Sequence, residues 1–175
     1  FNISREDQDL FAYNSQQKTA EAQTNGIFNQ EIVPITVKVG RKETKVFKQD
    51  EHPRASTSLA GLANLKTPFR KGGSVTAGNA SGINDGACAL LLANEAAMQE
   101  NGLNAIARVL GMATSGVEPR IMGIGPASAS QKVLKQTGLS LEQIDVIELN
   151  EAFAAQGLAT MRELGLDDDD VRVNP

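Results

Sequence analysis

The chain has 175 residues, of which 41% are hydrophobic and 22% are charged, so it can bury a core and is not expected to be disordered. Aromatic residues make up only 4% and the net charge is −4, which argues against nucleic acid as a partner. One cysteine excludes an internal disulfide, and no apolar run approaches the roughly 20 residues of a membrane span, so we expect no membrane partner.

The two ends of the chain predict its context. It opens at Phe1 without an initiator Met and without a basic-then-apolar signal peptide. The single cysteine suits a reducing compartment, so we expect a cytoplasmic protein. It closes at Val173-Asn174-Pro175 without a loose polar tail. We therefore expect a fragment of a longer protein, cut at both ends, although processing would look the same.

A long helix and a hairpin are expected first. Residues 5–24 are rich in Gln, Ala and Glu, Ser4 with Asp7 resembles a capping box, and Asn25-Gly26 supplies an end. The helix has no clean apolar stripe, so one side should be exposed. Residues 32–39 predict a strand, at an edge because of Pro34, and a turn at 40–43 leads to a second strand over 44–48.

The hairpin carries five basic side chains against Glu43: Lys38, Arg41, Lys42, Lys45 and Lys48. Two interpretations remain open for this charge. It makes an edge strand that resists aggregation, or it guides an anionic ligand.

Strands and helices alternate over the rest of the chain. A glycine-rich loop at 71–86 precedes an unbroken apolar run at 87–93, which predicts a strand buried on both faces. The following elements are expected in order: a helix at 95–101 ended by Gly102, a strand at 107–112, a helix at 130–137 ended by Gly138, a strand at 145–149, and a helix at 151–164 ended by Gly165. This alternation predicts an α/β protein with a parallel sheet.

No complete catalytic set is visible among the residues with reactive side chains. Cys88 lies inside the apolar run and is expected in the core, where a thiol reacts little. His52 lies in a polar, turn-like context and is interpreted as a surface or ligand-contacting residue. One Cys and one His give no metal site of usual spacing, and the loop at 123–126 lacks the third glycine of a dinucleotide fingerprint.

Asn150 is the residue whose position indicates a site. It follows the predicted strand and precedes the predicted helix, at the carboxyl end of a parallel strand, where open α/β sheets bind ligands. An Asn amide can polarise a developing oxyanion directly or through water. The alternative is a plain helix N-cap, and position alone does not separate the two.

Three motifs together resemble the thiolases, enzymes that cleave or form 3-oxoacyl-CoA thioesters. They are Asn150-Glu151-Ala152-Phe153-Ala154, Thr76-Ala77-Gly78-Asn79-Ala80-Ser81-Gly82 and Met122-Gly123-Ile124-Gly125-Pro126. The terminal Val173-Asn174-Pro175 fits as well, and the resemblance covers the whole chain in order. Residues 108–114 and 145–159 are most similar to the degradative branch that acts on β-ketoadipyl-CoA.

The resemblance implies a reaction and a set of site residues. In thiolases a Cys thiolate takes the acyl group, and that Cys, a His and a second Cys lie outside this segment, so the chain alone should be inactive. Asn150 matches the Asn that holds the oxyanion-hole water. The remaining matches bind CoA, which is a substrate and not a permanently bound cofactor: Ser81, Ala77, Ala80 and Gly82 along pantetheine, Phe69, Met122 and Phe153 in its tunnel, and Arg54 at the nucleotide end.

The resemblance also implies a layered αβαβα fold, present only in part. Residues 1–83 match the loop domain, 84–103 end the N-terminal core half, and 104–175 begin the C-terminal half, with a homo-oligomer, dimer or tetramer, expected. Three alternatives stay open: a biosynthetic acetoacetyl-CoA thiolase, a non-catalytic acyl-CoA-binding relative, and a stand-alone structural module.

Overall fold

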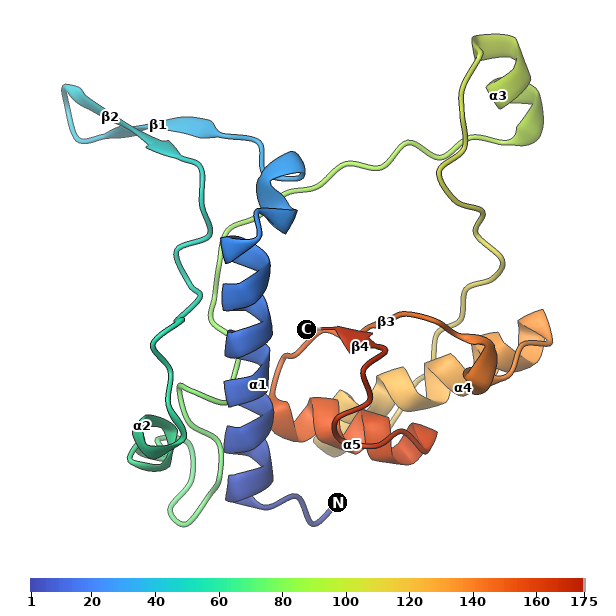
Figure 1. The fold of residues 1–175 in the computed structure, drawn as a ribbon. Coiled ribbons are helices and arrows are strands. Elements are labelled where there is room, and N and C mark those ends of the chain that lie inside the picture. The colour runs from blue at the N-terminus through green and yellow to red at the C-terminus, as the bar shows by residue number, and fades with distance from the viewer. Residues whose placement is uncertain (175) are drawn as a thin grey trace. The chain divides into compact units, whose positions relative to one another are not determined.

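The computed structural model describes residues 1–174, which divide into two compact units. The first unit combines Phe1–Gly82 with the segment that starts at Asp145, and the second unit is Ile83–Ile144. Figure 1 labels the helices and strands of both units. Of the predicted terminal motif, Pro175 lies outside the described residues.

Helix α1 (Arg5–Thr24) has both ends where the sequence predicts them. The Ser4 hydroxyl accepts a hydrogen bond of 2.9 Å from the N–H of Asp7, whose carboxylate accepts one from the N–H of Ser4, which completes the capping box. The helix ends at Asn25, ahead of a left-handed glycine at position 26. One side is buried and the rest is partly or fully exposed, as predicted.

The core of the first unit forms where α1 contacts α5 (Ala154–Leu164) and α2 (Leu59–Ala63), as Figure 1 shows. Leu158 and Met161 of α5 are only 1% and 2% exposed. At Gly157 an added Cβ would lie 2.9 Å from Cζ of Phe11, so the two helices approach closely there. A residue without a side chain permits that approach.

A βαβ unit carries α5. Strand β3 (Ile147–Glu148) pairs in parallel with β4 (Val173–Asn174), with Ile147 opposite Val173, and α5 lies between them in the sequence. This βαβ unit has the parallel pairing that the alternation of strands and helices predicts, but the partner strand β4 was not predicted and β3 is shorter than the expected 145–149. Helix α5 ends at Gly165 with a φ of 77°, as predicted.

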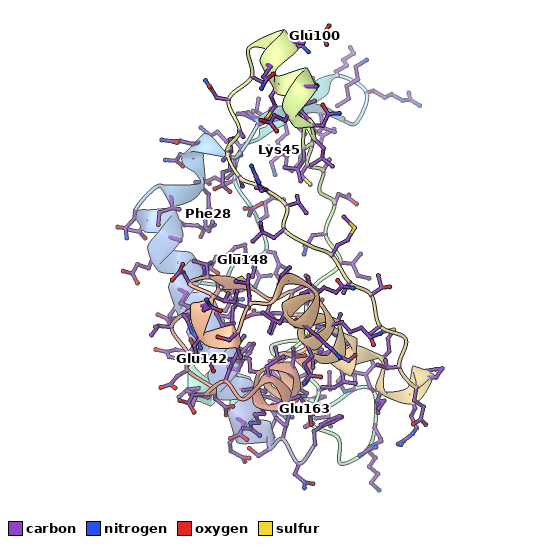
Figure 2. The ribbon with its side chains drawn as sticks, turned by 90° about the vertical axis from the view of Figure 1, so that its right-hand side faces the viewer. Phe28, Lys45, Glu100, Glu142, Glu148 and Glu163 are labelled. Atoms are coloured by element: carbon purple, nitrogen blue, oxygen red, sulfur yellow. The ribbon has the colours of Figure 1, made fainter. Side chains whose placement is uncertain are left out.

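The predicted hairpin is confirmed. Strand β1 (Ile35–Val39) pairs antiparallel with β2 (Glu43–Phe47), and β1 begins only after Pro34, which lacks an N–H for the ladder. Nearly all residues of the two hairpin strands are exposed. Lys45, labelled in Figure 2, forms an ion pair of 2.8 Å with Glu51 and lies 4.4 Å from the centre of the Phe47 ring. Its charge is therefore partly neutralised.

In the second unit both predicted α-helices are present and end where the sequence predicts. Helix α3 (Glu95–Asn101) ends at Gly102, and α4 (Gly125–Thr137) ends at Gly138, both left-handed glycines. Helix α4 starts five residues earlier than predicted, and it contacts the preceding 3₁₀ helix η2 (Pro119–Ile124). Short 3₁₀ turns complete the described chain at η1 (Ile27–Gln30) and η3 (Leu141–Gln143).

Two predicted strands of the second unit, 87–93 and 107–112, are wrong. Both segments are extended chain without a strand partner among the described residues, as Figure 1 shows. The side chains of Leu90 and Met112 are 88% and 80% exposed, and Cys88, expected in the core, is exposed as well. Apolar runs become buried strands only when neighbouring strands supply hydrogen bonds and covering side chains. No strand of residues 1–174 pairs with these runs, and most of their side chains stay exposed.

Candidate functional site

Two loops meet in the first unit, and both carry motifs that the sequence analysis singled out. The N–H of Ser81 donates a hydrogen bond of 3.0 Å to the carbonyl of Ala152, and the N–H of Ala154 donates one of 2.9 Å to the carbonyl of Asn79. Ala80 and Phe153 form an isolated antiparallel bridge between these bonds. We call the paired segments 79–81 and 152–154 the loop junction.

The buried side chain of Asn79 organises the first loop. Its Oδ1 accepts a hydrogen bond of 2.7 Å from the N–H of Thr76, and its Nδ2 donates bonds of 3.0 Å to the Ser74 carbonyl and to Oδ1 of Asp9. Asn79 and Asp9 are 3% and 4% exposed. Buried amides need all these partners, so the loop has one favoured conformation.

Asp9 links this loop to α1. Its carboxylate forms an ion pair of 2.8 Å with Nε of Arg5, whose guanidinium donates to the carbonyls of Leu62 and Leu65 at 2.7 and 3.2 Å. The same two leucines lie against Gly78, where an added Cβ would come within 2.4 Å of Leu62 Cδ2. A side chain at position 78 would therefore push the loop away from α2.

Asn150 is not the helix N-cap. Helix α5 begins at Ala154 with Phe153 as the capping residue, because the loop junction holds residues 152–154 in extended pairing first. The cap interpretation is therefore wrong, as is the predicted helix start at 151. The Asn150 side chain is exposed and has no hydrogen-bond partner among residues 1–174, which leaves its amide available to a ligand.

The other predicted site residues of the first unit fall into two groups. At the loop junction lie Ala80, Ser81 and Phe153, and the Phe153 ring is 42% exposed. Outside those paired segments lie Ala77, which is exposed, Gly82, which is half-buried, Phe69, which is 76% exposed, and Arg54, which is exposed. Asn150 precedes Ala152, the hydrogen-bond partner of Ser81, by two positions in the chain. Met122 lies in η2 of the second unit and is 73% exposed there.

His52 and Arg54 belong to a segment that contacts both the first loop and α1. An added Cβ at Gly82 would lie 2.5 Å from Cε1 of His52, so the imidazole ring packs against this glycine. The N–H of Arg54 donates a hydrogen bond of 2.6 Å to Oε1 of Gln16 on α1. His52 is exposed, as the interpretation of a surface residue requires.

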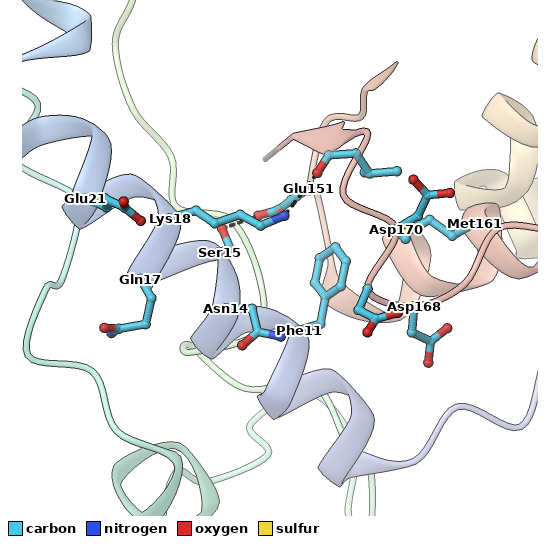
Figure 3. A pocket seen from close by; sticks show the side chains of 12 residues that line it. Phe11, Asn14, Ser15, Gln17, Lys18, Glu21, Glu151, Met161, Asp168 and Asp170 are labelled. Atoms are coloured by element: carbon cyan, nitrogen blue, oxygen red, sulfur yellow. Dashed lines mark hydrogen bonds between the residues drawn. The ribbon is translucent and has the colours of Figure 1, made fainter. Parts of the chain in front are cut away.

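Sequence reasoning missed a polar cluster beside the loop junction. The Ser15 hydroxyl of α1 donates a hydrogen bond of 2.6 Å to Oε2 of Glu151, and Nζ of Lys18 donates one of 3.1 Å to the carbonyl of Val173 (Figure 3). Burial raises the pKa of Glu151, and the Ser15 hydrogen bond and the Lys18 charge oppose that rise. The pair is separated by 136 residues, so no local pattern in the sequence could reveal it.

This cluster lines a cavity of about 240 Å³ between α1 and the chain around α5. Its walls combine apolar and charged side chains, which include Phe11, Lys18, Glu151, Met161, Asp168 and Asp170. Residues 1–174 contain no group of three or more side chains that could hold a metal ion. Nor do they contain a helix long and apolar enough to cross a membrane.

Comparison with known proteins identifies relatives over the whole chain. The family model described as "Thiolase, N-terminal domain" matches residues 1–96, and "Thiolase, C-terminal domain" matches residues 103–175. A beta-ketoadipyl-CoA thiolase from Acinetobacter baylyi is 60% identical over 175 residues, all of this chain and 44% of the relative. A 3-oxoadipyl-CoA/3-oxo-5,6-dehydrosuberyl-CoA thiolase from Escherichia coli is 56% identical over 173 residues, 99% of this chain and 43% of the relative.

A solved structure agrees with the sequence comparison. The crystal structure of the Bacillus anthracis acetyl-CoA acetyltransferase superposes with a TM-score of 0.92 at 50% identity, covering 98% of this chain and 43% of that protein. The predicted α/β fold of thiolase type is thereby confirmed, present in part. The chain spans less than half the length of the relatives it matches.

Proposed function

Because the chain belongs to the thiolase family, we propose that it forms the central part of a complete thiolase polypeptide that cleaves 3-oxoadipyl-CoA with CoA. The products are acetyl-CoA and a shortened acyl-CoA. The observation that carries this proposal is the loop junction, which joins the Ser81 loop to the segment that bears an exposed, unpartnered Asn150 amide. The names of the relatives at 56–60% identity support the choice of substrate.

In the proposed reaction, a Cys thiolate outside this chain attacks the 3-oxo carbon of the substrate. The bond between C2 and C3 then breaks, its electron pair passes to the acetyl-CoA enolate, and protonation of C2 releases acetyl-CoA. The acyl-enzyme passes its acyl group to the thiol of free CoA, which regenerates the Cys. The catalytic Cys, His and second Cys are all expected outside residues 1–175, so this chain alone should be inactive.

Asn150 supplies the oxyanion donor in this scheme. Its amide N–H groups, directly or through a bound water, stabilise the negative charge that develops on the thioester oxygen as the enolate forms. Asn150 follows β3, at the carboxyl end of a parallel strand pair, which is where open α/β sheets bind ligands. The Asn150 amide has no hydrogen-bond partner among residues 1–174, which is consistent with a donor that binds substrate.

The Ser81 loop is proposed to bind the pantetheine arm of CoA, with Ala77, Ala80 and Gly82 as its small residues. Small side chains let the thioester arm approach the backbone. Exposed aromatic rings at Phe69 and Phe153 support an apolar contact with this arm. Met122, which belongs to the second unit, is proposed as a further apolar residue of the tunnel. Arg54 is proposed to meet the phosphate-bearing end of CoA through its exposed guanidinium.

Several broader properties follow from the same proposal. CoA and acyl-CoA act as substrates, and no permanently bound cofactor is needed. The complete polypeptide is proposed to be a cytoplasmic homo-oligomer, either a dimer or a tetramer. Residues 1–83 would then form the loop domain, 84–103 would end the N-terminal core half and 104–175 would begin the C-terminal half.

A second candidate is a biosynthetic acetoacetyl-CoA thiolase, which the superposition on an acetyl-CoA acetyltransferase favours. The test is kcat/KM of the complete polypeptide for thiolysis of 3-oxoadipyl-CoA and of acetoacetyl-CoA. We expect the first substrate to be preferred by at least about tenfold, or about 1.4 kcal/mol. A preference for acetoacetyl-CoA would select the second candidate, and CoA binding without turnover of either substrate would select a non-catalytic relative.

A further inference from the structure

We propose that Glu151 is a positioning residue for Asn150, held in place by the hydroxyl of Ser15 on α1. This inference rests on the proposed role of Asn150 as an oxyanion donor. Because Ser15 lies on α1, the proposal gives this helix a part in catalysis, although Ser15 is 136 positions away from Glu151 in the sequence.

The argument begins with the backbone around Asn150. On one side, the N–H of Leu149 contacts the carbonyl of Asn174 at 3.5 Å, at the end of the β3–β4 ladder. On the other side, the carbonyl of Ala152 accepts a hydrogen bond of 3.0 Å from Ser81. Between these two points the Asn150 side chain makes no hydrogen bond within residues 1–174, so it cannot fix its own position.

Glu151 supplies the missing restraint. Its carboxylate accepts a hydrogen bond of 2.6 Å from Ser15, a short, charge-assisted contact of the strong kind. In Figure 3 the two side chains point toward each other across the gap between α1 and the 151 segment. This bond fixes the direction of the residue next to Asn150, and thereby the direction in which the Asn150 amide leaves the backbone.

The surroundings of Glu151 indicate that its bond to Ser15 restrains the side chain and is not an incidental surface contact. Its carboxyl lines the cavity beside Phe11 and Met161, and burial raises its pKa. Ser15 and Lys18 of α1 act directly on the Glu151 carboxyl. The same cavity is also lined by Glu21 of α1 and by the three aspartates that follow α5, Asp168, Asp169 and Asp170. A glutamate side chain without such a restraint would extend into solvent, where Glu163 lies on the exposed face of α5 (Figure 2).

The experiment measures steady-state thiolysis of 3-oxoadipyl-CoA by the complete polypeptide. We expect Glu151→Ala to lower kcat by about 10- to 100-fold, because moving a catalytic group by about 1 Å can reduce the rate that much. KM for CoA should change less than about twofold. Glu151→Gln keeps an acceptor for Ser15 and should stay within about threefold of wild type. The matched control Glu163→Ala removes an exposed carboxylate and should leave kcat unchanged.

A double variant separates positioning from a general structural role. In the Asn150→Ala background, Glu151→Ala should cause no further loss of kcat, because no amide remains to be positioned. A full additional loss in that background would overturn the proposal. If Glu151→Ala does not fold, Ser15→Ala decides: a kcat lowered by about 3- to 10-fold supports the proposal, and an unchanged kcat contradicts it.

The outcomes distinguish this inference from the proposed function. An unchanged kcat in Glu151→Ala together with a low kcat in Asn150→Ala would overturn the positioning role alone. An unchanged kcat in Asn150→Ala would overturn the oxyanion role of that residue, and the positioning role with it.

Discussion

The backbone N–H of Ser81 donates a hydrogen bond of 3.0 Å to the carbonyl of Ala152, two residues beyond Asn150. This bond brings together segments that are about 70 positions apart, one rich in small residues and one that carries the exposed amide of Asn150. Together with the bond from the N–H of Ala154 to the Asn79 carbonyl, it joins the proposed CoA-binding loop to the segment of the proposed oxyanion donor. Changes in either segment should therefore alter kcat or KM.

Enlarging the side chain at Ser81 tests the binding role of its loop. The Ser81 side chain is exposed and only its N–H is used at the loop junction, so Ser81→Trp should fold while obstructing the pantetheine arm. We expect KM for CoA in the complete polypeptide to rise by about tenfold, or about 1.4 kcal/mol, in steady-state thiolysis. Ser81→Ala is the control and should leave KM near that of wild type; an unaltered KM in Ser81→Trp would reject the placement.

Removing the Asn79 amide tests what holds the loop. Asn79→Ala removes the partner of the Thr76 N–H, of the Ser74 carbonyl and of Oδ1 of Asp9, whose other oxygen stays paired with Arg5. We therefore expect a loss of about 3 kcal/mol in the free energy of unfolding. Urea denaturation of the complete polypeptide measures it. The control Asn64→Ala removes an exposed bond to the Ala60 carbonyl and should cost less than about 1 kcal/mol. Equal losses in both variants would contradict the structural role of Asn79.

Adding a methyl group at Gly78 tests its close approach to α2. An Ala Cβ there would lie 2.4 Å from Leu62 Cδ2 and 2.6 Å from Leu65 Cδ1, so these side chains or the loop must move. We expect Gly78→Ala to destabilise the protein by about 1–3 kcal/mol. Gly86→Ala meets no atom within 4 Å and is the matched control, measured by the same denaturation. A Gly78→Ala protein as stable as this control would show that the contact is not formed.

The raised pKa of Glu151 predicts a pH dependence of stability. Below the ordinary Glu pKa of 4.5 the carboxyl is protonated in both folded and unfolded chains. In that range Glu151 is uncharged, as Gln is in the Glu151→Gln variant. As pH rises above 4.5, the unfolded chain ionises first, so the folded state loses stability until pH passes the raised folded pKa. The melting temperature of wild type should fall relative to Glu151→Gln over this window. A difference that does not vary with pH would refute the effect of burial.

Much of the fold could be predicted because it depends on local chemistry. The capping box at Ser4 and the glycines at 102, 138 and 165 mark helix ends that the structure reproduces. These signals work because a cap or a left-handed glycine acts within a few residues. The strands at 87–93 and 107–112 failed because an apolar run cannot indicate which segment will pair with it.

The site divides in the same way. The motifs around Ser81 and Asn150 are visible in the sequence, but their contact through Ala152 is not. That tertiary contact delays the start of α5 to Ala154, which is why the N-cap interpretation of Asn150 failed. The Ser15–Glu151 bond had no local signal, since Ser15 lies in the middle of a helix and Glu151 fits equally well as a charge near a helix start.

The most direct test of the central claim is kcat for 3-oxoadipyl-CoA thiolysis by the Asn150→Ala form of the complete polypeptide. If the exposed amide of Asn150 stabilises the enolate oxygen, kcat falls by about 10²–10³-fold. The melting temperature stays near that of wild type, because the side chain is exposed and makes no hydrogen bond within residues 1–174. A kcat equal to that of wild type would contradict the account.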